Sequence, residues 1–235
     1  MHIVKSKYSK IDDAATIAIG ADFGCRKGWQ RNTPRLLDFV WRRYRPDVFI
    51  VAGDLSLRSE PHQYDEMIEC LSATHAQWIA VPGDHDRPVA VFRKYFGSTR
   101  KAVDIGKWRF LGLNTADRMF LKDEEDWLEQ NIKENSIVIS HMPPEAEGWT
   151  FHSLWPRSSG RFLRCVERHR SSIKAMYFGH IHGYSERSFL GIPMIATGAV
   201  AESKIVGNNR YEGEGFLEMV IFDVGSGQTT LAKMY

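Results

Sequence analysis

The sequence predicts an α/β layered domain, because short apolar strands alternate with amphipathic helices and the chain closes on a hairpin. The apolar runs lie at residues 16–20, 48–53, 78–83, 109–114, 136–141, 175–180 and 193–198. Each run is almost continuously hydrophobic and does not alternate with polar residues. This pattern is typical of a strand that is buried on both faces.

Segments with helical periodicity lie between several of these strands. Within residues 33–46, the apolar side chains between Leu36 and Tyr44 share one face, with Pro34 near the start and Pro46 at the end. Residues 61–74 and 123–135 have the same pattern, and the second segment opens with acids that suit the positive end of a helix. Alternating strands and helices indicate layered α/β architecture.

The remaining segments complete a single domain, which we expect to span residues 1–235. Two strand-like runs within 215–235 flank the turn sequence Gly-Ser-Gly-Gln, which predicts a closing hairpin. Residues 145–161 have no clear period and predict a long loop. We find no internal repeat and no interdomain linker.

Composition excludes several classes of protein. The chain has 43% hydrophobic and 26% charged residues, which is ordinary for a soluble globular protein. A net charge of +2 argues neither for nor against a nucleic-acid partner. The N-terminus lacks the pattern of a signal peptide, and no apolar run could span a bilayer, so we expect no membrane partner. Cys25, Cys70 and Cys165 are scattered, which argues against a disulfide framework and favours a cytoplasmic location.

Acidic and histidine side chains follow five of the predicted strands. They are Asp22, Asp54, the run Asp84, His85 and Asp86, then His141, and finally His180 and His182. The carboxyl ends of strands in an α/β sheet converge on one crevice, where ligands bind. One such residue would be an ordinary turn or cap residue, but five strand ends together favour a functional site.

The chemistry of these residues predicts a metal centre. Three ionised carboxylates in one crevice repel one another and need a compensating positive charge. Carboxylates combined with imidazoles suit zinc, manganese or iron. Six ligands are too many for one tetrahedral zinc, but they suit two metals that share a bridging carboxylate. Such a pair can stabilise in-line displacement at phosphorus.

Five sequence blocks, in order, resemble the calcineurin-like metallophosphoesterase superfamily. They are Ala-Asp-Phe-Gly (21–24), Gly-Asp-Leu-Ser-Leu (53–57), Pro-Gly-Asp-His-Asp (82–86), Ser-His-Met-Pro-Pro (140–144) and Gly-His-Ile-His (179–182). The segment before the fourth block is similar to the branch that contains class III cyclic-nucleotide phosphodiesterases. The resemblance implies a four-layer α/β/β/α sandwich of two mixed β-sheets flanked by helices. It also implies a hydrolase that uses a metal-bridging hydroxide.

The resemblance also assigns roles to individual residues. Asp22 and His182 would bind the first metal, and Asp54 would bridge both metals. The second metal would be bound by Asp84, His141 and His180. His85 would be the catalytic imidazole, and Asp86 would fix its orientation. The implied cofactors are two divalent or trivalent ions of manganese, iron or zinc.

Two positions depart from the family pattern. The family usually has a histidine ligand where this chain has Gly24, and the tyrosine that compensates in purple acid phosphatases is here Leu57. We therefore expect the first metal to bind weakly. Cys25 is an alternative ligand, although a buried thiol without a role is the simpler interpretation. At the second site Asp84 replaces the usual asparagine, and its added negative charge should hold that metal more tightly.

The favoured function is a phosphodiesterase acting on a small nucleotide-like phosphoester, with Arg87 as a candidate substrate-binding residue. A nuclease of the same fold is one alternative, because the segment from Arg26 to Arg45 combines basic residues with Trp29 and Trp41. We interpret this segment instead as a helix with a charged outer face. A catalytically weak scaffold protein is the other alternative, but His85 and the Gly-His-Ile-His block argue against it. The oligomeric state is left open.

Overall fold

Two mixed β-sheets pack face to face in this computed structural model, which describes residues 2–149, 152–198, 203–206, 209–212 and 217–234. The first sheet has the strand order β1-β5-β4-β3-β14-β15. Its strands are β1 (His2–Ile3), β3 (Thr16–Gly20), β4 (Val48–Ala52), β5 (Gln77–Val81), β14 (Leu217–Asp223) and β15 (Thr229–Met234). Because β3, β4 and β5 are parallel neighbours, their carboxyl ends share one edge.

The second sheet has the order β10-β11-β9-β8-β7-β6-β2. Its strands are β2 (Tyr8–Ile11), β6 (Lys101–Ile105), β7 (Trp108–Gly112), β8 (Ser136–Ser140), β9 (Ile173–Phe178), β10 (Tyr184–Phe189) and β11 (Ile192–Thr197). Strands β7, β8, β9 and β11 are parallel neighbours. A separate antiparallel pair consists of β12 (Ser203–Val206) and β13 (Asn209–Glu212).

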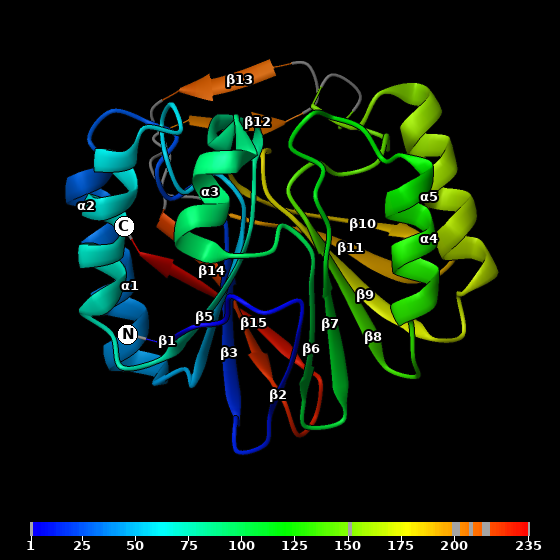
Figure 1. Cartoon of the computed structure of the whole chain (residues 1–235), viewed down its shortest axis with the longest axis horizontal. Coiled ribbons are helices and arrows are strands. Elements are labelled where there is room, and N and C mark those ends of the chain that lie inside the picture. Colours follow the sequence, from blue (N-terminus) through cyan, green and yellow to red (C-terminus); the bar gives the residue numbers. More distant parts are fainter. Residues whose placement is uncertain (1, 150–151, 199–202, 207–208, 213–216, 235) are drawn as a thin grey trace.

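Helices cover the outer face of each sheet, which confirms the predicted four-layer sandwich (Figure 1). The first sheet carries α1 (Trp29–Tyr44), α2 (Pro61–Ser72) and α3 (Val89–Phe96), and the second carries α4 (Lys122–Asn131) and α5 (Pro156–Arg168). Three apolar clusters fill the three interfaces between layers. In β3, Ile17 and Ile19 face the other sheet while Ala18 faces the helices, so both faces of the strand are buried.

The predicted elements are present, with boundaries that differ by a few residues. The closing hairpin forms from β14 and β15. Helix α1 begins at Trp29, five residues before Pro34. The loop predicted for 145–161 is wrong from Pro156 onward, where α5 begins. The serines and the glycine at the start of α5 have low helix propensity, so the helix depends on burying Phe162 and Val166 against the second sheet. Among the described residues, no helix has both the length and the apolar character needed to cross a bilayer.

Candidate metal centre

Loops from both sheets bring all six predicted metal ligands to one edge of the sandwich. Asp22 follows β3, Asp54 follows β4, Asp84 follows β5, His141 follows β8, and His180 and His182 follow β9. Their donor atoms form two sets, within each of which all atoms lie within 4.8 Å of one another. We call Asp22, Cys25, Asp54 and His182 the first group, and Asp84, His141 and His180 the second group. The two groups adjoin, since His141 Nε2 lies 3.5 Å from Asp54 Oδ1.

Four of these residues have an unusual backbone conformation. Asp22, Asp54, His180 and His182 have positive φ angles of 60°, 60°, 66° and 58°. Few non-glycine residues adopt this left-handed conformation, and such strain concentrates at functional sites. Glycine would adopt this conformation with less strain. The aspartates and histidines in these tight turns are therefore explained by their side chains and not by backbone preference.

The loops also pack too closely for extra side-chain atoms. A Cβ atom on Gly83 would lie 2.2 Å from Asp54 Oδ1, and one on Gly53 would lie 2.5 Å from His141 Nδ1. Glycine at these two positions therefore lets the backbone approach the donor side chains directly.

The second group is held by contacts within the protein. His141 Nδ1 lies 2.8 Å from the Ala52 carbonyl oxygen, and because a carbonyl only accepts, Nδ1 donates and Nε2 faces the acids. Asp84 Oδ1 lies 2.9 Å from His141 Nε2 and 3.1 Å from His180 Nδ1. Burial alone would lower the pKa of His141, but Asp54 and Asp84 raise it well above its usual value. Burial likewise opposes ionisation of Asp84, but hydrogen bonds from His141 and His180 lower its pKa.

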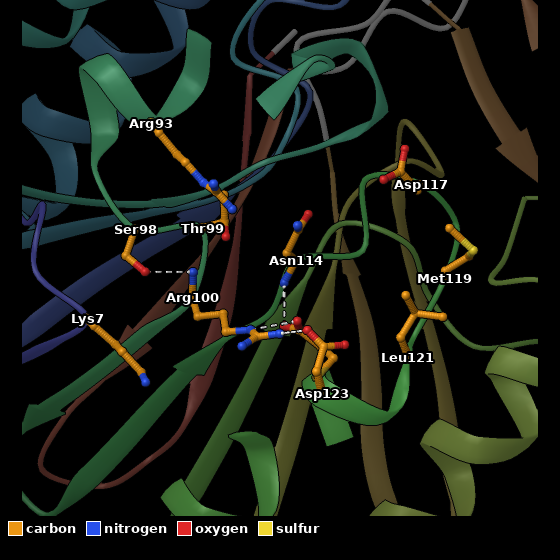
Figure 2. A pocket seen from close by; sticks show the side chains of 11 residues that line it. Lys7, Arg93, Ser98, Thr99, Arg100, Asn114, Asp117, Met119, Leu121 and Asp123 are labelled. Carbon is orange, nitrogen blue, oxygen red and sulfur yellow. Dashed lines mark hydrogen bonds and ion pairs between the residues drawn. The ribbon is translucent and has the colours of Figure 1, made fainter. Parts of the chain in front are cut away.

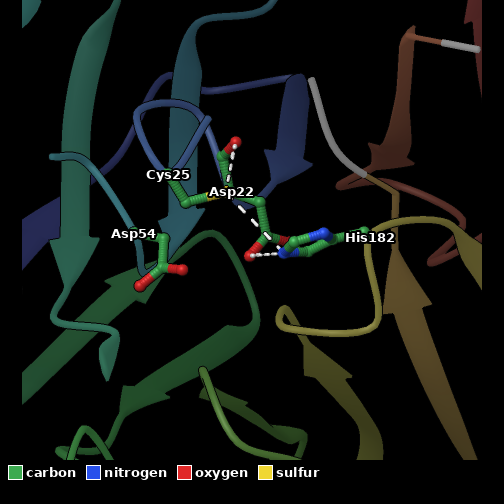
Figure 3. A group of neighbouring side chains, drawn as sticks. All are labelled: Asp22, Cys25, Asp54 and His182. Carbon is green, nitrogen blue, oxygen red and sulfur yellow. Dashed lines mark hydrogen bonds and ion pairs between the residues drawn. The ribbon is translucent and has the colours of Figure 1, made fainter. Parts of the chain in front are cut away.

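The first group has looser contacts and less compensation of charge (Figure 3). His182 Nε2 lies 3.7 Å from Asp22 Oδ1 and 3.7 Å from Cys25 Sγ. Asp54 is fully buried, and its Oδ2 has no hydrogen-bond partner among the residues that the structure describes. Burial raises the pKa of Asp22 well above its usual value and that of Asp54 to about 7. Asp22 accepts from the backbone nitrogen of His180, and Asp54 Oδ1 accepts from that of His85, but no neighbouring cationic side chain in the described part of the chain fully compensates these two buried carboxylates. A bound cation would stabilise them, so this donor set fits a metal ion.

Arg26 contacts the far side of the His182 ring. Its Nη2 lies 3.3 Å from His182 Nδ1. A guanidinium can only donate, so Nδ1 accepts and Nε2 of the neutral ring carries the hydrogen. Metal binding through Nε2 therefore requires the other tautomer of His182 and a shift of Arg26. The sequence placed Arg26 near the site but gave no sign of this contact.

His85 adjoins Asp84 in the chain and donates its backbone N–H to Asp54 Oδ1 at 3.0 Å, but its ring is oriented differently from our prediction. His85 Nδ1 lies 2.8 Å from the Leu57 carbonyl oxygen, so Leu57 and not Asp86 fixes the imidazole. The Asp86 carboxylate is buried and accepts from the backbone nitrogens of Leu55, Ser56 and Gly83. Asp86 thus ties the loop after β4 to the loop after β5, and its predicted role as the orienting partner of His85 is wrong.

Other candidate residues lie around these groups. Arg87 is half-exposed, donates to the backbone oxygen of Asp84 and pairs with Asp117 at 3.4 Å. The His152 ring lies 5.5 Å from the His180 ring, and Arg118 stacks over Trp155 at 4.3 Å. No local sequence pattern marks His152, which lies in the segment 145–161 that lacks a recognisable period.

Asp117 also borders a polar hollow of about 370 Å³ (Figure 2). Arg100 in this hollow is already paired with Asp123 and Glu124, at 2.6 and 2.7 Å. None of the six predicted metal ligands lines the hollow. It is therefore a neighbouring feature and not part of the metal centre.

Comparison with known proteins agrees with this geometry. A family model described as calcineurin-like phosphoesterase matches residues 15–184. The chain belongs to this family. The resemblance inferred from the five sequence blocks is thereby confirmed, and the family implies divalent metal ions at the donor groups.

Curated relatives carry phosphodiesterase names. A probable cyclic nucleotide phosphodiesterase of Synechococcus is 26% identical over 170 residues, which cover 64% of this chain and 66% of that protein. A 3′,5′-cyclic-nucleotide phosphodiesterase of Nostoc is 25% identical over 207 residues, covering 80% of this chain and 77% of that protein. The structure of this chain also superposes on that of a dimetal phosphatase from Danio rerio, with a TM-score of 0.66 and 14% identity. The match covers 94% of this chain and 99% of that one. At this identity the structural match shows the fold alone.

Proposed function

We propose that this phosphoesterase is a phosphodiesterase that uses two metal ions to hydrolyse a small nucleotide-like diester. The observation that carries the proposal is the adjoining pair of donor groups, with the unpartnered Asp54 Oδ2 in the first group and Asp54 Oδ1 3.5 Å from His141 of the second. The phosphodiesterase names of the Synechococcus and Nostoc relatives support the diester class. Bound metals would supply Lewis acidity and lower the pKa of a nucleophilic water.

The protein residues would orient the substrate and transfer a proton. Because His85 Nδ1 donates to the Leu57 carbonyl, Nε2 is the nitrogen available to a substrate. A proton on Nε2 would pass to the leaving alkoxide as the bond to phosphorus breaks. Asp86 keeps the two loops that carry Asp54 and Asp84 in register, and Arg87 stands beside Asp84 as a guanidinium for a phosphoryl oxygen.

Two observations favour a small diester over a nucleic acid. Trp29 of α1 is 4% exposed, so its ring is not available for stacking on bases, and the partly buried Trp41 packs against the apolar cluster between the first sheet and its helices. The Arg45 guanidinium lies over the Trp41 ring at 5.7 Å and Arg43 lies over the Tyr44 ring at 5.6 Å, so these aromatic faces are already in contact with side chains of the protein. A catalytically weak scaffold protein is less well supported, because the six predicted metal ligands and His85 lie close together.

Hydrolysis by chelated protein tests the proposal. After addition of Mn²⁺ or Zn²⁺, we expect turnover of bis-p-nitrophenyl phosphate at least about tenfold faster than that of p-nitrophenyl phosphate, a difference of about 1.4 kcal/mol. If neither metal gives turnover of either substrate, the proposal that the protein is an enzyme is rejected. If the monoester is hydrolysed faster than the diester, the proposed preference for diesters is rejected. Comparing 3′,5′-cyclic nucleotides with a single-stranded oligonucleotide then separates the proposal from a nuclease. The cytoplasmic location, inferred from the cysteines, stays a prediction.

A further inference from the structure

The first group lacks a donor at the position where the sequence resemblance places a histidine. Gly24 occupies this position, and a Cβ atom there would lie 2.4 Å from the Leu55 carbonyl oxygen and 2.7 Å from the Ser56 nitrogen. Both contacts are to backbone, which cannot turn away as a side chain can. No side chain fits at position 24 in this loop, so a further ligand has to come from another residue.

Cys25 is the next residue, and its thiol lies inside the first group. The side chain is 3% exposed, and Sγ lies 3.6 Å from the Asp22 carbonyl oxygen and 3.7 Å from His182 Nε2 (Figure 3). Cys165, by contrast, packs in the apolar cluster between the second sheet and its helices. Cys25 belongs to none of the three apolar clusters, so its surroundings are those of a donor atom and not of a packing thiol.

We propose that Cys25 is a thiolate ligand of the first metal, an inference that rests on the proposed function. Atoms bound at 2.0–2.3 Å to one tetrahedral ion lie roughly 3.3–3.6 Å apart. The 3.7 Å separations of His182 Nε2 from Cys25 Sγ and from Asp22 Oδ1 are close to this spacing. On binding, the S–H bond breaks, its proton passes to water, and a sulfur–metal bond forms.

A second observation, the environment of Asp54, also indicates a cation in the first group. Asp54 is fully buried, its Oδ2 has no hydrogen-bond partner, and the Asp54 carboxylate belongs to the same donor set as Cys25 Sγ. A single ion there would satisfy this oxygen and the thiolate together.

The donor set also restricts the metal. Thiolate, imidazole and carboxylate ligands together suit Zn²⁺ or Fe²⁺, whereas Mn²⁺ and Mg²⁺ prefer oxygen ligands. The two groups should therefore differ in selectivity, with the thiolate-containing first group favouring Zn²⁺, Co²⁺ or Fe²⁺ over Mn²⁺. With Cys25 as a ligand the first metal has four protein donors, so it need not bind weakly as the sequence predicts.

Cobalt titration of chelated protein tests the inference, because a thiolate ligand gives a charge-transfer band in the near ultraviolet. We expect this band to grow with one of two bound Co²⁺ equivalents in the wild type and to vanish in Cys25→Ser. The Kd of that equivalent should rise at least about tenfold in the variant, or about 1.4 kcal/mol. Zinc-loaded wild type should show a sulfur neighbour at about 2.3 Å by X-ray absorption.

Two control variants separate Cys25 from the other thiols. Cys165→Ser is essential, because Glu129, Cys165 and His169 form another donor set on α4 and α5. Cys70→Ser tests a half-buried thiol on α2. Both controls should keep the cobalt band.

Several outcomes would overturn the inference. If the wild type binds two cobalt ions without showing the band, Cys25 is not a ligand, and this result does not require Cys25→Ser to fold. If that cobalt enzyme still hydrolyses diesters, the proposed function stands. A band that persists in Cys25→Ser, or that vanishes in Cys165→Ser, would assign the thiolate elsewhere. A protein that neither binds cobalt nor hydrolyses diesters would overturn both proposals.

Discussion

The first and second donor groups contain similar residue types, but they differ in how closely contacts within the protein hold the side chains and compensate their charges. In the second group the Ala52 carbonyl fixes the His141 ring, and Asp84 Oδ1 contacts both His141 and His180 within 3.1 Å. In the first group the contacts of His182 Nε2 with Asp22 and Cys25 are 3.7 Å long. The side chains of the second group therefore contact one another closely, whereas Asp22 and Asp54 of the first group accept mainly from the backbone nitrogens of His180 and His85.

The charge balance follows the same division. His141 compensates Asp84 and part of Asp54, so the second group carries its own counter-charge. Asp22 and Asp54 are buried with raised pKa values, and Asp54 Oδ2 has no partner. The contact of Arg26 with His182 Nδ1 also stabilises the tautomer that cannot bind a metal through Nε2. The buried carboxylates of the first group thus have more negative charge for a cation to compensate than Asp84 of the second group, which His141 contacts directly.

Replacing Asp54, which belongs to the first group and lies 3.5 Å from His141 of the second, should have the largest effect. If Asp54 bridges two metals, Asp54→Asn turns the shared carboxylate into an amide, so we expect metal content to fall at both groups and diester hydrolysis to fall at least about 10⁴-fold. Metal analysis and steady-state kinetics measure this. Asp38→Asn, which removes an exposed acid paired with Arg42 on α1, is the control. Loss of metal from one group only would mean that Asp54 does not bridge.

His85 belongs to neither group, and its removal should separate chemistry from metal binding. His85→Ala should lower kcat about 10³-fold, because the proton donor for the leaving oxygen is lost, while the metal content stays that of the wild type. His62→Ala changes an exposed histidine on α2 and is the control. Turnover close to that of the wild type would remove His85 from the proton-transfer step.

The stability of metal-free protein should distinguish the groups directly. His141→Ala leaves two buried carboxylates without their counter-charge, so we expect a loss of about 3 kcal/mol in the free energy of unfolding. His182→Ala removes the 3.7 Å contacts with Asp22 and Cys25 and the 3.3 Å contact with the Arg26 guanidinium, but it leaves no carboxylate without a close counter-charge, so its loss should stay below about 1 kcal/mol. Urea unfolding of chelated protein measures both values. Equal losses of unfolding free energy in the two variants would show that the two groups contribute equally to the stability of the metal-free protein.

The smallest effect should come from the acid that replaces the usual asparagine of the family. Asp84→Asn removes one negative charge from the second group, and we expect its metal affinity to fall about tenfold, or about 1.4 kcal/mol. Activity at saturating metal should change less than about threefold. Asp117→Asn removes a nearby exposed acid and should leave affinity unchanged, as isothermal titration would measure. Unchanged affinity in Asp84→Asn would argue against a charge effect.

Local sequence patterns were sufficient to predict much of this molecule. Apolar runs bounded by turn residues identified the central strands, because strands buried on both faces need continuous hydrophobicity. Asp22, Asp54, Asp84, His141, His180 and His182 follow those strands directly, so a general rule about strand ends placed them together. Helix α5 was not predicted, since its first turns have weak propensity and depend on packing against the second sheet.

Only the tertiary structure decided which way the neighbouring side chains face. Asp86 turns toward the backbone of the loop after β4, His85 bonds to Leu57, and Cys25 points at His182 from a segment far away in the chain. These directions depend on how loops from different strands pack against one another, at glycines that permit close approach. The sequence by itself therefore determined which residues reach the metal centre, whereas contacts between distant loops determined what each of them does there.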